Sequence, residues 1–112
     1  MNSPGIRIEP RHWEIVASIL RRHIPDRDVW AFGSRVSGRV KPYSDLDLIV
    51  AGREPLTLST LAAITTDFED SSLPFKVDVV DWVLTSSSFR KAIEGARVLV
   101  QSAEKTPSAE AR

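Results

Sequence analysis

Apolar residues recur along the chain with two different periods, which together predict its secondary structure. Positions spaced three and four residues apart predict helices over residues 10–22 and 56–68, and the serines at 86–88 offer an N-cap for a last helix over 86–94. Pro10 suits the first position of the first helix, and Gly95 suits the end of the last. The inner face of the first helix comprises Trp13, Val16, Ala17 and Leu20, with Ile24 extending it.

Short apolar runs between these helices predict strands over 28–32, 45–51, 76–84 and 97–101. Residues 34–41 are expected to form a short helical turn or loop. Alternating helices and strands predict an α/β (α+β) fold, in which helices flank a small mixed β-sheet. The faces of the second strand follow from its alternation: one carries Leu46, Leu48 and Val50, and the other carries Asp45, Asp47 and Ile49.

The chain of 112 residues fits a single domain. We place this domain at residues 10–102, after a flexible lead-in over 1–9 and before a tail over 103–112 that we expect to be disordered. No apolar run approaches the roughly 20 residues needed to cross a bilayer, and the first residues lack the apolar stretch of a signal peptide. We therefore expect a small soluble domain in the cytoplasm, without membrane contact.

Composition excludes some classes of function. Fifteen basic residues balance fifteen acidic ones, so net charge gives no reason to expect binding to nucleic acid. Because the chain has no cysteine, it can form neither a disulfide framework nor a thiolate zinc site.

Asp45 and Asp47 are the first candidates for chemistry. Two carboxylates inside an apolar strand are not needed to build a core, and burying them unpaired is costly. They lie two residues apart, so both point the same way with Cα atoms about 6.5–7 Å apart. Hard oxygen ligands so placed suit Mg²⁺, which takes one or two carboxylates together with substrate phosphates. An isolated Asp-x-Asp in a strand is nevertheless more often structural.

Gly33 and Ser34 are candidates for holding phosphate. Glycine permits a close backbone approach, and a serine at the mouth of a helical turn offers a hydroxyl and N–H groups. Arg35, Arg39 and Lys41 follow and could neutralise phosphate charge, although each taken alone is more often a solvated surface charge. Trp13, Trp30 and Trp82 fit a core better than a base-stacking platform.

Together these motifs resemble the DNA polymerase beta-like nucleotidyltransferase superfamily. The resemblance rests on Ala-Phe-Gly-Ser-Arg at 31–35, Tyr-Ser-Asp-Leu-Asp-Leu at 43–48, and the stretch from Leu73 to Trp82. It is strongest to the minimal nucleotidyltransferases, which include the MntA-type antitoxins, and it implies the palm-like fold of that superfamily. Asp78 matches the position of the family's third carboxylate.

The resemblance implies a catalytic centre in which Asp45, Asp47 and Asp78 hold two Mg²⁺ ions. Asp78 would also be the base for the acceptor hydroxyl. Gly33 and Ser34 would bind the triphosphate, with Arg35 and Ser44 as further nucleotide-binding candidates. Asp81 should face away from this centre as a cap or surface residue.

The implied reaction is Mg²⁺-dependent transfer of a nucleoside monophosphate, AMP from ATP, to a hydroxyl on a partner protein. Larger relatives append a helical acceptor-binding domain, so we expect a separate small helical partner of the HEPN type, as toxin or as acceptor subunit. The sequence also leaves room for a homodimer. Two alternatives stay open: a non-catalytic module that neutralises such a partner by binding, and an Asp-x-Asp glycosyltransferase. The acceptor, the base preference and the oligomeric state are not specified by the sequence.

Overall fold

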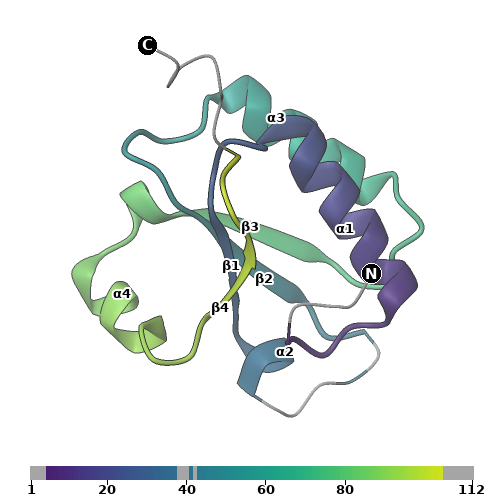
Figure 1. The fold of residues 1–112 in the computed structure, drawn as a ribbon, viewed down its shortest axis with the longest axis horizontal. Helices are drawn as coiled ribbons and strands as arrows, with labels where there is room; N and C mark the ends of the chain where they lie inside the picture. Colours follow the sequence, from purple (N-terminus) through teal and green to yellow (C-terminus); the bar gives the residue numbers. More distant parts are fainter. Residues whose placement is uncertain (1–4, 38–40, 42, 105–112) are drawn as a thin grey trace.

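Four strands form one mixed sheet in the order β3-β2-β1-β4 (Figure 1). The structure, a computed structural model, describes residues 5–37, 41 and 43–104. The strands are β1 (Val29–Phe32), β2 (Leu46–Val50), β3 (Val77–Asp81) and β4 (Val98–Gln101). β1 is antiparallel to both β2 and β4, whereas β2 and β3 are parallel and are joined by a helical crossover. The pairing of β1 with β4 is irregular between Val29 and Trp30.

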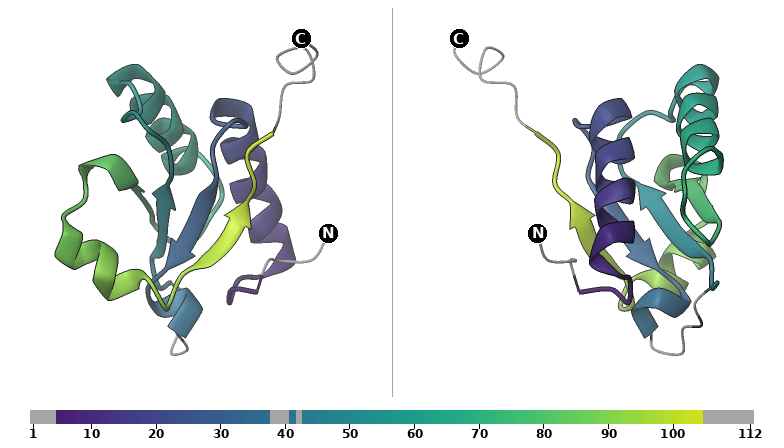
Figure 2. Two further views of the ribbon diagram at one scale, coloured as in Figure 1. Left: turned by 60° about the vertical axis from the view of Figure 1, so that its left-hand side comes forward. Right: turned by 90° about the vertical axis from the view of Figure 1, so that its right-hand side faces the viewer.

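Helices lie on both faces of this sheet, as Figures 1 and 2 show. α1 (Pro10–His23) and α3 (Leu58–Glu69) pack side by side over one face. The short α2 (Ser34–Ser37) follows β1, and the 3-10 helix η1 (Trp82–Leu84) leads into α4 (Ser87–Ile93), which lies against the opposite face. The predicted fold class is confirmed. Among the described residues, no helix is both long enough and apolar enough to cross a membrane.

The core lies between the sheet and the α1–α3 pair. The predicted alternation of β2 is observed, because Leu46, Leu48 and Val50 are fully buried on this side. The predicted inner face of α1 is also buried. Thr57 caps α3 by accepting a hydrogen bond from the Thr60 N–H, so α3 begins at Leu58, slightly later than expected.

The third strand is shorter than the sequence predicts. It ends at Asp81, and residues 82–84 form η1 instead of continuing the strand to Leu84. The reason is that Asp81 pairs with Val50, the last residue of β2, so the chain beyond it has no strand to pair with. Asp81 lies away from the aspartate pair, as predicted, and accepts a hydrogen bond from the Leu56 N–H at 2.7 Å.

The ends of the predicted domain are only partly described, and its limits stay a prediction. Residues 5–9 form neither helix nor strand, yet Ile6 is buried in the core and the Arg7 N–H donates to the Arg35 carbonyl. At the other end, the Ala103 N–H donates to Asp28 and the Glu104 N–H to the Pro25 carbonyl. The remaining predicted tail lies outside the described residues.

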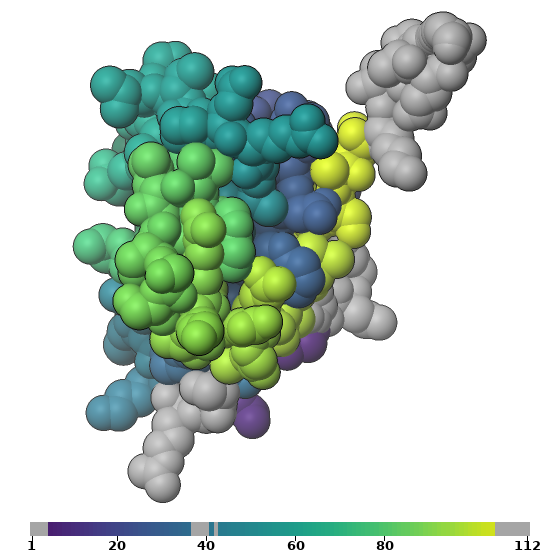
Figure 3. All heavy atoms as spheres, turned by 90° about the vertical axis from the view of Figure 1, so that its left-hand side faces the viewer, coloured from purple at the N-terminus to yellow at the C-terminus, as the bar shows by residue number. Residues whose placement is uncertain are grey.

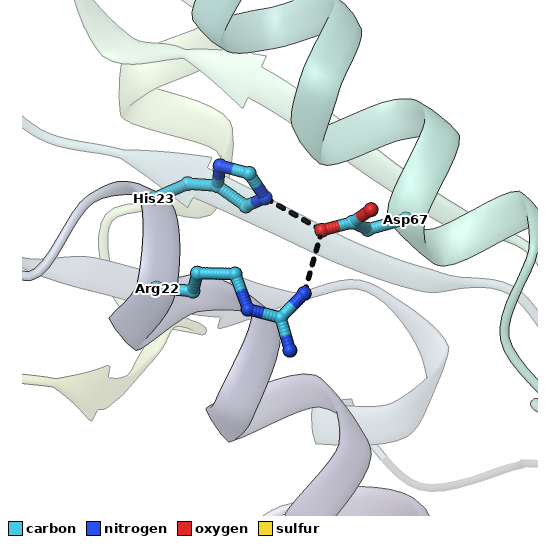
Figure 4. A network of polar contacts seen from close by, with 3 residues as sticks. All are labelled: Arg22, His23 and Asp67. Carbon is cyan, nitrogen blue, oxygen red and sulfur yellow. Dashed lines mark hydrogen bonds and ion pairs between the residues drawn. The ribbon is translucent and has the colours of Figure 1, made fainter.

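A small polar network joins α1 to α3 (Figure 4). Asp67 Oδ2 lies 2.6 Å from His23 Nε2 and accepts a hydrogen bond of 3.0 Å from Arg22 Nη1. The hydrogen bond with His23, followed by the charges of His23 and Arg22, lowers the pKa of Asp67. A carboxyl with a lowered pKa stabilises the fold above its unfolded-state pKa and loses that effect as the pH falls through its folded-state pKa.

Replacing Asp67 by asparagine should therefore lower the midpoint of thermal unfolding at pH 7. The difference in midpoint between the variant and the parent should narrow below about pH 4, where the Asp67 carboxyl of the unfolded chain is protonated. Thermal melts followed by circular dichroism at pH 7 and pH 3 measure the midpoints of the variant and the parent at each pH. Asp26→Asn, at an exposed aspartate, is the control and should leave the midpoint unchanged. Equal midpoints for Asp67→Asn and the parent at pH 7 would contradict the stabilising role of the network.

Candidate active site

Asp47 and Asp78 lie side by side on neighbouring strands. They are direct partners in the parallel pairing of β2 and β3. Because the alternate residues Leu46 and Leu48 face the core, both carboxylates belong to the face that α1 and α3 leave uncovered. Asp45 immediately precedes β2 and is exposed. The structure thus brings together the three predicted carboxylates at one end of the sheet.

The pKa of Asp47 responds to its burial and to the two neighbouring carboxylates. Burial raises the pKa of its carboxyl, and the charges of Asp78 and then Asp45 raise it further. Each effect disfavours the ionised form, since burial removes water and like charges repel. A cation placed among the three carboxylates would relieve this repulsion.

Gly33 forms the turn that ends β1 directly beside Asp47. Its φ of +83° lies in the left-handed region, which favours glycine. A β-carbon at this position would overlap Oδ2 of Asp47. Phe32, the preceding residue, is the partner of Asp47 across β1 and β2. The glycine therefore serves two purposes, since it allows the turn and leaves room for the carboxylate.

Ser34 follows this turn as the first residue of α2 and is half-buried. The Val36 N–H closes the turn by donating to the Gly33 carbonyl at 3.0 Å. The two predicted phosphate-holding residues therefore lie where β1 ends and next to Asp47. Their contact with a nucleotide stays a prediction.

Arg35 has a structural role that its sequence position did not reveal. Its side chain is only 5% exposed, and its guanidinium donates to the Arg7 carbonyl at 2.7 Å and to the Ser44 carbonyl at 2.8 and 3.0 Å. It also stacks 4.1 Å from the centre of the Phe75 ring. Burial lowers the pKa of Arg35, and the nearby charge of Asp45 opposes that effect. These contacts indicate that Arg35 anchors the segment before Asp45, and they favour this structural role over the predicted nucleotide contact.

Ser44 and Lys41 lie in that anchored segment. The Ser44 hydroxyl accepts a hydrogen bond from the Lys41 N–H at 2.9 Å, and the Ser44 N–H donates to the Lys41 carbonyl at 3.0 Å. The hydroxyl of Ser44 thus closes a turn ahead of the aspartate pair, and its predicted nucleotide contact is not tested. Arg39, the other basic residue predicted here, lies outside the described residues.

Lys76 is a residue near the centre that the sequence reading missed. Its Nζ lies 3.5 Å from Oδ1 of Asp78, and both side chains are substantially exposed. The sequence contained a signal for this contact: Lys76 and Asp78 are two residues apart, and residues at that spacing in an extended segment point the same way. The ammonium shows that a cation can already approach Asp78 from solvent.

The three aspartates fit a metal ion that arrives with a ligand of its own. Within the described residues, no three acidic, histidine or cysteine side chains converge on a ready-made metal site. Asp45 lies before the strand and Asp78 is turned toward Lys76, so the set is spread out. Mg²⁺ commonly binds in this way, taking one or two carboxylates and completing its shell with phosphates and water.

A large hollow lies away from these aspartates. It has a volume of about 1040 Å³ and contains none of the three aspartates. It is lined by the segment before α1, the start of α1, residues 72–74 and Arg35 itself. The neighbouring aspartates at the end of the sheet, and not this hollow, define the candidate active site.

Known proteins resemble this chain over most of its length. Residues 14–106 match the family model described as polymerase beta, nucleotidyltransferase. A protein of Haemophilus influenzae, described as a probable protein adenylyltransferase MntA, is 44% identical over 99 residues, which are 88% of this chain and 87% of that protein.

Solved structures show the same fold at low sequence identity. A chain of a toxin–antitoxin complex with AMP-PNP aligns with a TM-score of 0.66 and 22% identity, covering 82% of this chain and 74% of that one. A chain of a complex between tri-AMPylated Shewanella oneidensis HEPN toxin and MNT antitoxin aligns with a TM-score of 0.63 and 20% identity, covering 93% and 78%. At these identities the two alignments establish the fold alone.

Proposed function

The chain belongs to the polymerase beta nucleotidyltransferase family, and on this premise we propose that it transfers AMP from ATP to a hydroxyl of a HEPN-type partner protein. The relative at 44% identity, described as a protein adenylyltransferase, supports the choice of AMP and of a protein acceptor. The tri-AMPylated HEPN toxin bound to an MNT antitoxin supports the class of partner. Because the reaction consumes ATP, we place it in the cytoplasm.

One observation carries the proposal: Asp47 and Asp78 lie in the same register of two parallel strands, beside a turn that only glycine fits. This arrangement places two acids next to a glycine, whose lack of a β-carbon permits a triphosphate to approach the chain closely. A pure binding module would have no need for acids that repel one another.

Divalent metal ions are general in this superfamily, and the proposed pair here is Mg²⁺. Asp45, Asp47 and Asp78 would hold it, and the mutual repulsion that raises the pKa of Asp47 is the reason a cation fits. When bound, the metal neutralises phosphate charge and supports both the attacking and the leaving oxygen of an in-line displacement.

The chain's own groups account for positioning and proton transfer. Gly33 has no β-carbon to keep the triphosphate at a distance, and Ser34 offers its hydroxyl and N–H at the start of α2. Asp78 is exposed enough to take the proton from the acceptor hydroxyl. Lys76 must first move away from Asp78, because its ammonium is paired with that carboxylate. The acceptor oxygen attacks the α-phosphorus, the bond to the β-phosphate oxygen breaks, and pyrophosphate leaves. Tyrosine is the proposed acceptor.

A transfer assay with differently labelled ATP tests this function. The chain, its HEPN-type partner and Mg²⁺ should move label from α-labelled ATP to the partner, but none from γ-labelled ATP. Mass spectrometry should place AMP on a tyrosine, and EDTA should abolish the transfer.

The double variant Asp45→Asn/Asp47→Asn provides the decisive comparison in the same assay. It should bind the partner and transfer no label. If this variant silences the partner as well as the parent does, neutralisation by binding is the function instead. Transfer at the parental rate by this variant would refute the assignment of the catalytic centre.

A further inference from the structure

A stack of aromatic and guanidinium groups lies on the same face of the sheet as the aspartates. Arg97, just before β4, lies with its guanidinium carbon 4.3 Å from the centre of the Trp30 ring and 5.2 Å from that of the Trp82 ring. Trp30 belongs to β1 and Trp82 begins η1, so three separate parts of the chain meet here. In Figure 3, which looks onto this face, atoms of the β1 region (blue) are visible between the light-green η1–α4 segment and the yellow β4.

Two arginines contact Trp82, and they differ in their hydrogen bonds to the described residues. Arg90 lies 4.7 Å from the Trp82 ring and donates to the Trp82 carbonyl at 2.8 Å and to Thr85 Oγ1 at 2.9 Å. Arg97 makes no hydrogen bond or ion pair with any residue that the structure describes. Its ring contacts hold the guanidinium beside the two indoles, while its N–H donors have no partner among the described residues.

A pocket lies against this stack. Its volume is about 260 Å³, and it is lined by Trp30, Ile49, Ala51, Trp82 and Arg97. This is smaller than the roughly 300–1,000 Å³ of typical small-molecule sites, so it suits a single side chain. Among the described residues that line it, the one charged group is the cation Arg97, and the others are apolar or aromatic. A carboxylate on a short aliphatic stem matches both properties, because guanidinium binds carboxylate through two parallel hydrogen bonds.

The pocket also lies next to the catalytic centre. Trp30 pairs with Ile49 and Phe32 pairs with Asp47, so the pocket is two residues, about 6.5–7 Å, farther along the same two strands. Any protein whose hydroxyl reaches Asp47 and Asp78 must cover this part of the face. From 89 to 97 the bordering segment carries three basic residues and one acidic residue, which favours an acidic partner surface.

We propose that the partner protein docks by inserting an aspartate or glutamate side chain into the Trp30–Arg97–Trp82 pocket. The carboxylate accepts hydrogen bonds from Arg97, and its stem packs against the two indole rings. Tryptophan and arginine are the residues that most often dominate the energy of protein interfaces. The proposal deepens the proposed function and rests on it, since it presumes a protein acceptor.

Binding is measured without nucleotide, so that docking is separated from catalysis. Isothermal titration of the partner in EDTA should show that Arg97→Glu raises the Kd by at least about thirtyfold, as expected for a dominant interface residue. Arg21→Glu, at an exposed position on α1 across the sheet, is the matched control and should leave the Kd unchanged. An unchanged Kd for Arg97→Glu would overturn the docking proposal.

A second variant identifies the carboxylate directly and does not depend on loss of binding. Arg97→Lys keeps the charge and introduces an amine, which a carbodiimide should join to a partner carboxylate as an amide. Mass spectrometry should then find position 97 linked to an aspartate or glutamate of the partner. If this link is absent although the complex forms, the proposal fails.

Two further outcomes distinguish partner docking at this pocket from nucleobase binding and from the transfer reaction. If Arg97→Glu raises the KM for ATP and leaves partner binding intact, the pocket holds the nucleobase and the docking proposal is overturned. If the parent binds its partner through Arg97 but transfers no label, the proposed reaction fails while the docking site stands.

Discussion

Asp47→Asn is expected to lower the kcat of nucleotidyl transfer by on the order of 10³-fold or more. Phosphoryl chemistry depends on positioning and charge neutralisation, and losing one group that stabilises the transition state costs about this much or more in related reactions. Asparagine keeps the shape of Asp47 but removes the charge that would hold a metal ion. Single-turnover transfer to the partner measures the effect.

The same substitution should raise, and not lower, the stability of the metal-free protein. Burial and the charges of Asp78 and Asp45 raise the pKa of Asp47, so the folded state binds the proton more tightly than the unfolded chain does. Stability from such a group is complete below its unfolded-state pKa and is lost as the pH rises through its folded-state pKa. Thermal melts in EDTA should show Asp47→Asn above the parent at pH 7.5, with the gap closing toward pH 3.

Asp26→Asn serves again as the control, because it removes a carboxylate from an exposed position. It should change neither transfer nor the unfolding midpoint. Full activity in Asp47→Asn would refute the catalytic centre. A lower midpoint for Asp47→Asn at pH 7.5 would show that the three carboxylates do not repel one another as described.

Gly33→Ala should impair both folding and catalysis. Its φ of +83° is unfavourable for a residue with a β-carbon, and strain of this kind costs about 1–3 kcal/mol. The added methyl would also overlap the Asp47 carboxylate and force it to move. Displacing a reacting group by about 1 Å can cost 10²-fold in rate, so we expect at least that loss in kcat. Denaturant unfolding and transfer rates measured well below the unfolding midpoint report the two effects.

Gly95→Ala is the matched control for this substitution. A β-carbon at Gly95 would meet no atom within 4 Å. Its effect on stability should stay within about 0.5 kcal/mol, and transfer should be unchanged. If Gly33→Ala behaves like Gly95→Ala, the turn at the end of β1 does not constrain the catalytic centre.

The fold could be predicted well because local patterns determine most of it. The three- and four-residue spacing of α1 and the alternation of β2 specify which side chains face the core, and the structure buries them as expected. The end of β3 could not be predicted in this way. The run from Val77 to Leu84 has the composition of a strand throughout, and only the length of β2, which ends at Val50, decides that it stops at Asp81.

Only part of the candidate site could likewise be predicted from the sequence. The acids could be found because their spacing and surroundings are unusual in a strand, and the family resemblance supplied Asp78. The role of Arg35 could not be found, because its partners are carbonyls of Arg7 and Ser44. Every residue has a backbone carbonyl, so the residue type does not show which carbonyls accept hydrogen bonds from a buried arginine. The same limit applies to Trp30 and Trp82, which look like core residues until Arg97 is placed between them.

The position of β4 has a consequence for how the sheet avoids joining other chains. β4 is the last strand in the order, and it contains no charged residue to discourage pairing along its outer edge. Its protection is geometric: it is four residues long, and its pairing with β1 is irregular where it passes Val29 and Trp30. A short, irregular edge is a poor template for a further strand, so brevity and shape replace charge as the safeguard against aggregation.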